Sequence, residues 1–232
     1  MKKTDDPEFD RYAHTYKELH KQSVQASGEE PEYFAAYKAA YMAGALGHLS
    51  KSRLDILDFG CGVGGSTPHL RVFFPGAEIT GMDVSGESIA LARAANPETS
   101  YKAITDDVLD LPDDSVDVAM AACVYHHIPP EQRLRWTLEL QRVLKPGGHF
   151  FLFEHNPFNP LTRKVVNECP FDEDAILLKS GESAKLLADA GFKQTKISYI
   201  VFFPKAMAGF RPLESYLSWL PLGAQYVAHG VA

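Results

Sequence analysis

The chain of 232 residues has only three cysteines, Cys61, Cys123 and Cys169, and no C-x-x-C pair. An odd number of widely spaced cysteines argues against a disulfide framework and against a structural zinc site. No apolar run approaches the roughly 20 residues of a membrane-spanning helix, and the N-terminus lacks the apolar segment of a signal peptide. We therefore expect a protein of the reducing cytoplasm without a membrane span.

Positive charge is scarce as well. Lysine and arginine number 23 against 30 acidic residues, which gives a net charge of −7, and no basic cluster occurs. A protein that follows a nucleic-acid backbone ordinarily carries a basic stripe. The composition therefore argues against nucleic acid as a partner and favours a small molecule. Hydrophobic residues make up 45% of the chain, so it can bury a sizeable core.

Short apolar runs alternate with helix-length segments from residue 54 onward. Strands are predicted at 54–59, 78–83, 101–105, 116–124 and 149–154, with two further candidates at 196–203 and 224–231. This alternation indicates a parallel sheet covered by helices on both faces. Residues 1–50 are expected to form an N-terminal helical cap, and 51–232 the main domain. The long irregular stretch 155–180 is expected to be an insertion on the substrate side.

The strongest motif is a glycine-rich turn after the first strand, Asp58-Phe59-Gly60-Cys61-Gly62-Val63-Gly64-Gly65. Glycines let the backbone turn sharply and let a ligand approach the main chain. Gly60 and Gly65 have the spacing of a phosphate loop, but no lysine follows. Gly60, Gly62 and Gly65 satisfy the dinucleotide pattern G-x-G-x-x-G, which is a weak signal alone. Asp58 would oppose a pyrophosphate and suits a ligand that carries an ammonium group.

Motifs in chain order resemble those of the class I S-adenosylmethionine-dependent methyltransferases. The glycine turn is similar to their E/D-x-G-x-G-x-G signature. The later motifs are Gly81-Met82-Asp83-Val84-Ser85, Asp107-Val108-Leu109, Ser115-Val116-Asp117-Val118 with Val124-Tyr125-His126-His127-Ile128, Leu144-Lys145-Pro146-Gly147-Gly148, and Ala190-Gly191-Phe192. The resemblance covers about residues 50–155 at motif level and extends more loosely to the C-terminus. It implies a doubly wound α/β fold with a seven-stranded mixed sheet, the Rossmann-like methyltransferase fold, whose last strand inserts antiparallel between strands five and six.

The resemblance also implies a cofactor, S-adenosylmethionine, with S-adenosylhomocysteine as its product. Asp83 would accept both ribose hydroxyls, Asp107 would accept from the adenine amino group, and Asp58 would face the methionine ammonium. The other implied cofactor contacts are Tyr16, Gly60, Cys61, Gly62, Gly64, Met82, Val84, Val108, Leu109 and Cys123. Asp106 and Asp110 compete with Asp107 for its role, and core packing is the alternative role for Tyr16.

Methyl transfer mainly requires that the acceptor be oriented and desolvated, and an oxygen or nitrogen acceptor can also need a base. His126 and His155 are the candidate catalytic bases, because they follow strands four and five, where open α/β sheets bind ligands. His127 and Asn156 are expected to contact the substrate. Loop hydrogen bonding is the alternative role of these histidines. A metal site built from Cys123 and the three histidines matches no zinc pattern, so no metal is expected.

The sequence therefore predicts an S-adenosylmethionine-dependent methyltransferase that acts at O, N or C on a small-molecule or saccharide- or lipid-linked acceptor. The alternatives are an NAD(P)-dependent oxidoreductase and a non-catalytic cofactor-binding module. Acidic residues near the expected site, Glu154 and Asp172 among them, could bind a cationic substrate, although such charges more often face solvent. The apolar segment 202–222 is expected to pack on the core, with a subunit or lipid contact as the alternative. A homodimer is left open.

Overall fold

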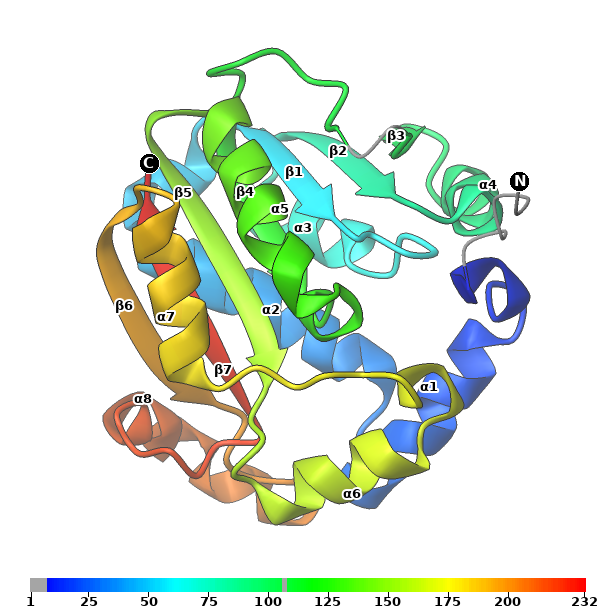
Figure 1. Cartoon of the computed structure of the whole chain (residues 1–232). Helices are drawn as coiled ribbons and strands as arrows, with labels where there is room; N and C mark the ends of the chain where they lie inside the picture. The colour runs from blue at the N-terminus through cyan, green and yellow to red at the C-terminus, as the bar shows by residue number, and fades with distance from the viewer. Residues whose placement is uncertain (1–7, 106–107) are drawn as a thin grey trace.

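A seven-stranded sheet runs through the computed structural model, which describes residues 8–105 and 108–232 (Figure 1). The strands are β1 Asp55–Phe59, β2 Glu78–Asp83, β3 Ser100–Ala103, β4 Val116–Ala122, β5 Leu144–His155, β6 Lys193–Ile200 and β7 Gln225–Val231, in the spatial order β3-β2-β1-β4-β5-β7-β6. Strands β1 to β5 pair in parallel, and β7 pairs antiparallel with both β5 and β6. The predicted mixed sheet, including the place of its last strand, is confirmed.

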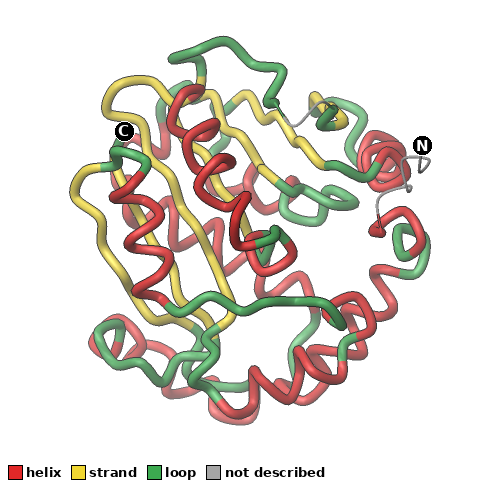
Figure 2. Tube along the Cα trace, in the orientation of Figure 1, coloured by secondary structure: helices red, strands yellow, loops and turns green. Residues whose placement is uncertain are grey.

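Helices cover both faces of the sheet (Figure 2). They are α1 Tyr16–Val24, α2 Pro31–Leu46, α3 Thr67–Phe73, α4 Gly86–Ala95, α5 Pro130–Val143, α6 Pro160–Glu168, α7 Ser180–Asp189 and α8 Glu214–Leu217. Alternation along β5 shows the two layers, because successive side chains of a strand point to opposite faces. Phe150 and Leu152 pack in the core with α5 and α7, whereas Phe151 and Phe153 pack in a second core with α2 and α3.

Helix α5 begins with a proline and buries one apolar stripe. Pro130 occupies its first turn, where the missing N–H costs nothing. Trp136, Leu140 and Val143 form the buried stripe, and the Trp136 ring lies 5.4 Å from that of Phe59. β1 and β4 pair directly in the sheet, so their carboxyl ends lie next to each other at the edge where ligands are expected.

The stretch 155–180 is more regular than predicted. It contains α6 and a short 3-10 helix, Pro170–Asp172. Asn159 begins α6, since its Oδ1 accepts the N–H groups of Leu161 and Thr162, both at 3.0 Å, and Pro160 follows in the first turn. An asparagine cap before a proline is an ordinary helix start. Helix α6 contacts α1 and lies below the carboxyl ends of the strands in Figure 1. The division into a cap and a main domain stays a prediction.

The segment 202–222 does not pack on the core as expected. It forms a 3-10 helix, Lys205–Leu213, followed by α8, and several large apolar side chains are exposed, including Phe210, Tyr216 and Trp219. Its anchor is the buried Glu214, which accepts hydrogen bonds from the Tyr37 hydroxyl at 2.7 Å and from the Phe202 N–H at 3.0 Å. Among the described residues, no helix is both long and apolar enough to cross a membrane.

Candidate functional site

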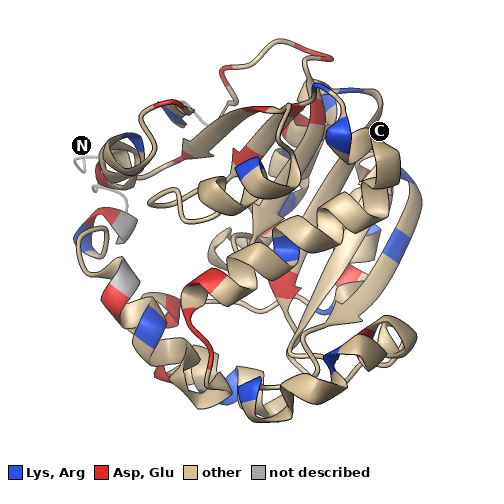
Figure 3. Cartoon of the chain, turned by 180° about the vertical axis from the view of Figure 1, so that it is seen from behind, with Lys and Arg blue, Asp and Glu red and all other residues tan. Residues whose placement is uncertain are grey.

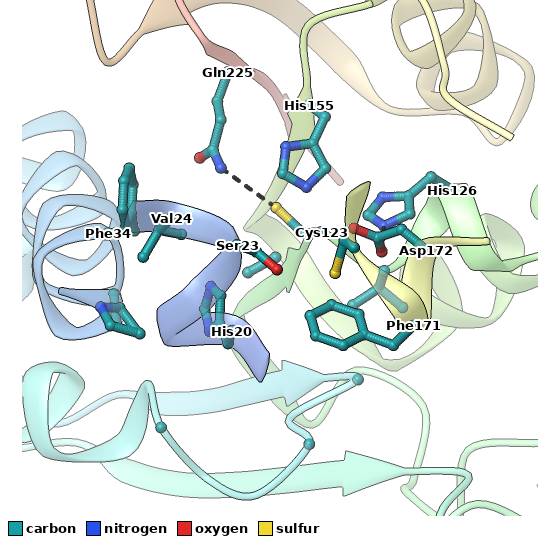
Figure 4. A pocket seen from close by; sticks show the side chains of 18 of the residues that line it. His20, Ser23, Val24, Phe34, Cys123, His126, His155, Phe171, Asp172 and Gln225 are labelled. Carbon is teal, nitrogen blue, oxygen red and sulfur yellow. Dashed lines mark hydrogen bonds and ion pairs between the residues drawn. The ribbon is translucent and has the colours of Figure 1, made fainter. Parts of the chain in front are cut away.

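A cavity of about 710 Å³ opens at the carboxyl ends of β1, β2, β4 and β5. Its other walls come from α1, α2, α6, residues 171–172 and Gln225 at the start of β7 (Figure 4). Acidic residues occur at or next to the ends of β1, β2 and β5, and Figure 3 shows acidic colour on strand ends beside the opening. Ligands of open α/β sheets bind at this edge, and cavities of about 300–1,000 Å³ hold small molecules.

The glycine turn after β1 forms one wall of this cavity. Gly60, Gly62 and Gly64 have φ angles of 72°, 50° and 77°, the left-handed region that favours glycine. The Gly60 N–H donates to the Met82 carbonyl at 2.7 Å. A Cβ atom on Gly60 would lie 2.4 Å from a methyl carbon of Val124. The turn is therefore fixed closely between β2 and the end of β4.

This packing predicts a stability loss for Gly60→Ala. The left-handed backbone alone is expected to cost about 1–3 kcal/mol, and the collision with Val124 adds to it. Urea unfolding of the purified variant measures the change in the free energy of unfolding. Gly86→Ala is the matched control, because Gly86 has no atom within 4 Å of its Cβ position. Equal unfolding midpoints for wild type and Gly60→Ala would contradict the prediction.

Two buried carboxylates lie at the ends of the adjacent strands β1 and β2. Asp83 accepts the Gly62 N–H at 2.8 Å and the Ser85 N–H at 2.9 Å, and burial raises its pKa against the opposing effect of these bonds. Asp58 is 2% exposed, and its Oδ2 has no hydrogen-bond partner among the described residues. Burial and then the nearby Asp83 raise the pKa of Asp58 to about 7. Asp58 is thus a buried acceptor suited to a cationic partner.

Lys38 is a site residue that the sequence reasoning missed. It lies on α2, is 8% exposed, and its Nζ is 3.8 Å from the Cys123 sulfur. Its charge acts on Asp58, whose pKa it lowers against burial. The available signal was one lysine within the otherwise uncharged stretch 33–46 of α2. A buried ammonium next to a cavity can bind an anionic group of a ligand.

His126 is held between two buried carboxylates. Its Nδ1 lies 2.7 Å from Glu154 Oε2, and its Nε2 lies 3.4 Å from Asp172 Oδ1. Burial alone would lower the pKa of His126, but Glu154 and Asp172 outweigh it and raise the pKa to about 10. The charged ring lacks the free lone pair that a base needs. The structure therefore argues against the predicted base role of His126.

His155 and His20 face the same cavity from opposite walls (Figure 4). Burial is the main cause that lowers the pKa of each to about 4, so both rings are neutral at pH 7. His155 ends β5, and its ring centre is 5.1 Å from that of His126. His20 was missed, although it follows Tyr16 at the i, i+4 spacing that joins side chains on one helix face. The Tyr16 ring lies 5.5 Å from His20 and 5.1 Å from Phe171.

The structure brings most of the predicted residues together around the cavity. Those that line it are Tyr16, Asp58, Gly60, Cys61, Gly62, Asp83, Val84, Cys123, His126, His127 and His155. Met82 and Leu109 are instead buried in the core, Gly64 backs onto Tyr101, and Val108 is exposed. Asp107 lies outside the described residues.

Asn156 is hydrogen-bonded within the fold. Its amide nitrogen donates to the carbonyls of Pro221 and Gly223 at 3.2 and 2.8 Å, and its Oδ1 accepts the Phe158 N–H at 3.1 Å. The side chain is 1% exposed. The carboxamide holds the C-terminal segment against the end of β5, and this arrangement argues against the predicted substrate contact.

Comparison with known proteins agrees with this geometry. A profile described as a methyltransferase domain matches residues 57–152. The chain is 31% identical over 150 residues to a trans-aconitate 2-methyltransferase of Mycobacterium tuberculosis, an alignment of 60% of this chain and 56% of that protein. It is 32% identical over 135 residues to a sterol 24-C-methyltransferase of Gibberella zeae, which covers 56% of this chain and 34% of that protein.

A solved structure gives the same fold over the whole chain. It comes from a complex between the Haloferax volcanii Trm112 methyltransferase activator and a candidate methyltransferase, with a TM-score of 0.67, 21% identity and 99% of each chain covered. At this identity the likeness concerns the fold alone. The chain spans about half the length of the trans-aconitate relative.

Proposed function

Since the chain belongs to the class I S-adenosylmethionine-dependent methyltransferase family, we propose that it transfers a methyl group from S-adenosylmethionine to a small-molecule acceptor. The observation that carries the proposal is the pair of buried carboxylates, Asp58 and Asp83, beside the glycine turn. When bound, S-adenosylmethionine supplies an activated methyl group together with its leaving group. The protein's own task is then to bind, orient and desolvate.

The residues present suit this cofactor. Asp58 has a buried oxygen without a hydrogen-bond partner in the described chain, which would accept from the methionine ammonium. Lys38, with its buried ammonium, would hold the methionine carboxylate. Asp83 would accept the ribose hydroxyls in charge-assisted hydrogen bonds. A dinucleotide suits the site poorly, because its pyrophosphate would approach Asp58 at the same turn.

The acceptor side of the cavity combines imidazole, aromatic and apolar side chains. His155 and His20 are neutral at pH 7, and Phe171 and Phe34 line the walls near them. A neutral imidazole can accept the proton of a hydroxyl or amino group that becomes methylated. The walls also exclude water from the reacting groups. This lining favours a small acceptor with a polar group next to an apolar body. A homodimer and a cytoplasmic location stay predictions from the sequence.

Binding of S-adenosylmethionine is expected to release a proton from Asp58. An ammonium next to this carboxylate favours the ionised form, so the pKa of Asp58, about 7 in the free protein, falls on binding. The cofactor's own amino group, with a pKa of about 7.7–8.0, is already protonated at pH 6. We expect about 0.9 proton released per cofactor at pH 6, and an affinity that falls about tenfold per pH unit below 7. Calorimetry in two buffers of different ionisation enthalpy measures the released protons.

The same experiment separates the proposed cofactor from NAD(P), the cofactor of the oxidoreductase alternative. Asp58→Asn is the matched variant, because it keeps the size of the side chain and removes the titration. It should bind the cofactor more weakly, without proton release. NAD⁺ should give no binding heat with the wild type. Binding of NAD⁺ in place of S-adenosylmethionine, or equal proton release from Asp58→Asn, would contradict the proposal.

A further inference from the structure

We propose that His126, His127 and Asp172 form a binding site for a divalent transition-metal ion of the zinc type. The three side chains converge from two separate segments, the short 3-10 helix Tyr125–His127 after β4 and the 3-10 helix Pro170–Asp172. Two imidazoles and one carboxylate are a donor set that such ions prefer. The inference goes beyond methyl transfer, and it concerns a set of residues different from the cysteine-containing one considered from the sequence.

The spacing of the donor atoms fits a metal ion. Asp172 Oδ1 lies 3.4 Å from His126 Nε2 and 3.3 Å from His127 Nε2, and all three donor atoms lie within 4.8 Å of one another. In a tetrahedral zinc site with bonds of about 2.0–2.1 Å, neighbouring donor atoms are about 3.3–3.4 Å apart. The measured separations to Asp172 therefore leave room for an ion between the donors.

Asp172 provides a second, independent observation. Its side chain is only 5% exposed, and apart from the ion-pair contacts with the two histidines its Oδ1 has no hydrogen-bond partner among the described residues. A buried carboxylate oxygen is costly unless it is hydrogen-bonded or coordinates a cation. Figure 4 shows Asp172 next to His126 on the cavity wall. This buried oxygen thus faces the two histidines rather than solvent.

Glu154 supplies the outer support that metal-binding histidines usually have. It is buried and lies 2.7 Å from His126 Nδ1, and its other oxygen accepts the N–H groups of Val124 and Tyr125 at 3.1 and 2.8 Å. A carboxylate on one ring nitrogen fixes the tautomer that presents the other nitrogen to a metal. Glu154 therefore turns His126 Nε2 toward Asp172, and a bound ion would replace the proton on that nitrogen.

The three donors also line the cavity proposed for the acceptor. Three protein ligands with a remaining position open to a cavity is the arrangement of a catalytic rather than a structural zinc site. That position would take water or an oxygen of a bound molecule. The test of this proposal is independent of methyl transfer, because metal binding is measured on the protein alone.

Calorimetric titration of chelator-treated protein with zinc chloride tests the site. We expect one ion bound per chain, with binding lost in Asp172→Asn and in His127→Ala. Glu154→Gln should lower the affinity by about 10- to 100-fold. His48→Ala is the control, since His48 lies exposed in the 3-10 helix Gly47–Lys51 far along the chain from the site, and it should bind as the wild type does. Unchanged binding in Asp172→Asn and His127→Ala would overturn the proposal.

Cobalt substitution keeps the test decisive where a variant fails to fold. The visible spectrum of the wild type with one equivalent of cobalt(II) should show a four- or five-coordinate ion with nitrogen and oxygen ligands, and no thiolate charge-transfer band. A thiolate charge-transfer band would show that the ion is bound by a cysteine, and this result would overturn the proposal. A spectrum identical to that of cobalt in buffer would also overturn the proposal. In that case His126 itself, in its protonated form, would be the positive charge between Glu154 and Asp172.

Discussion

Replacing His155 by glutamine is expected to slow methyl transfer by about 10²- to 10⁴-fold while the affinity for S-adenosylmethionine stays the same. His155 lies at the end of β5 on the cavity wall. It remains neutral because burial, with a further contribution from His126, lowers its pKa to about 4. Its lone pair is therefore available for the acceptor's proton at pH 7. The measurement is the rate of S-adenosylhomocysteine formation at saturating cofactor, with an acceptor found by a metabolite screen.

The pH profile distinguishes this role from a structural one. At saturating cofactor, so that Asp58 is already ionised, the acid limb of kcat/KM for the acceptor should lie near pH 4 rather than near the ordinary histidine value. His48→Gln serves as the control for histidine replacement on the surface. A wild-type rate in His155→Gln would show that His155 is not the base. A large loss of rate in His20→Gln instead would identify His20, on the opposite wall, as the base.

Asp83→Ala should weaken cofactor binding by about 30- to 1,000-fold, which corresponds to about 2–4 kcal/mol. The substitution removes the acceptor proposed for both ribose hydroxyls. It also removes the acceptor of the Gly62 and Ser85 N–H groups, so the glycine turn loses one of its attachments to β2. Both effects act against binding, because a loosened turn must be ordered again when the cofactor binds. Calorimetry with S-adenosylhomocysteine measures the affinity.

Two further variants separate ribose recognition from local stability. Asp83→Asn keeps the size of the side chain and one acceptor oxygen but loses the charge, so an intermediate loss of affinity is expected. Ser85→Ala removes the N-cap of α4, whose hydroxyl accepts the Ser88 N–H at 3.0 Å, and should cost about 1 kcal/mol of stability without weakening cofactor binding. An unchanged affinity in folded Asp83→Ala would show that Asp83 only supports the turn.

The order of the elements could be predicted from the sequence, because each strand is followed by a distinct motif. Three of these motifs locate β1, β2 and β5 in the sequence. They are the glycine turn, the acidic end of β2, and Leu144-Lys145-Pro146-Gly147-Gly148 before the core of β5. Helix α6 was missed because Asn156-Pro157-Phe158-Asn159-Pro160 looks like a loop, although Asn159 and Pro160 are a cap and a first turn. The exposure of Trp219 could not be foreseen, since an apolar side chain alone does not say what covers it.

The two carboxylates at the strand ends could be predicted from the sequence, whereas the protonation states of the site residues could not. Asp58 and Asp83 end neighbouring strands, so topology alone brings them together. The charge of His126 depends on Glu154, 28 residues further along the chain, and on Asp172 in another segment. Lys38 and His20 reach the cavity only because α1 and α2 fold across it. Such long-range contacts are set by tertiary packing, and no local spacing encodes them.

The position of β7 within the sheet has a consequence for how the nascent chain folds. Strand β6 joins the sheet only through β7, and β5 keeps an unpaired edge until β7 docks. While residues 225–231 are still inside the ribosome, the phenylalanine-rich β5 therefore presents open backbone groups, a template for wrong pairing with other chains. Co-translational folding can complete the half of the sheet from β3 to β5. The half that contains β6 and β7 can form only after residues 225–231 have emerged. A chaperone that covers the open edge of β5 would act during this interval.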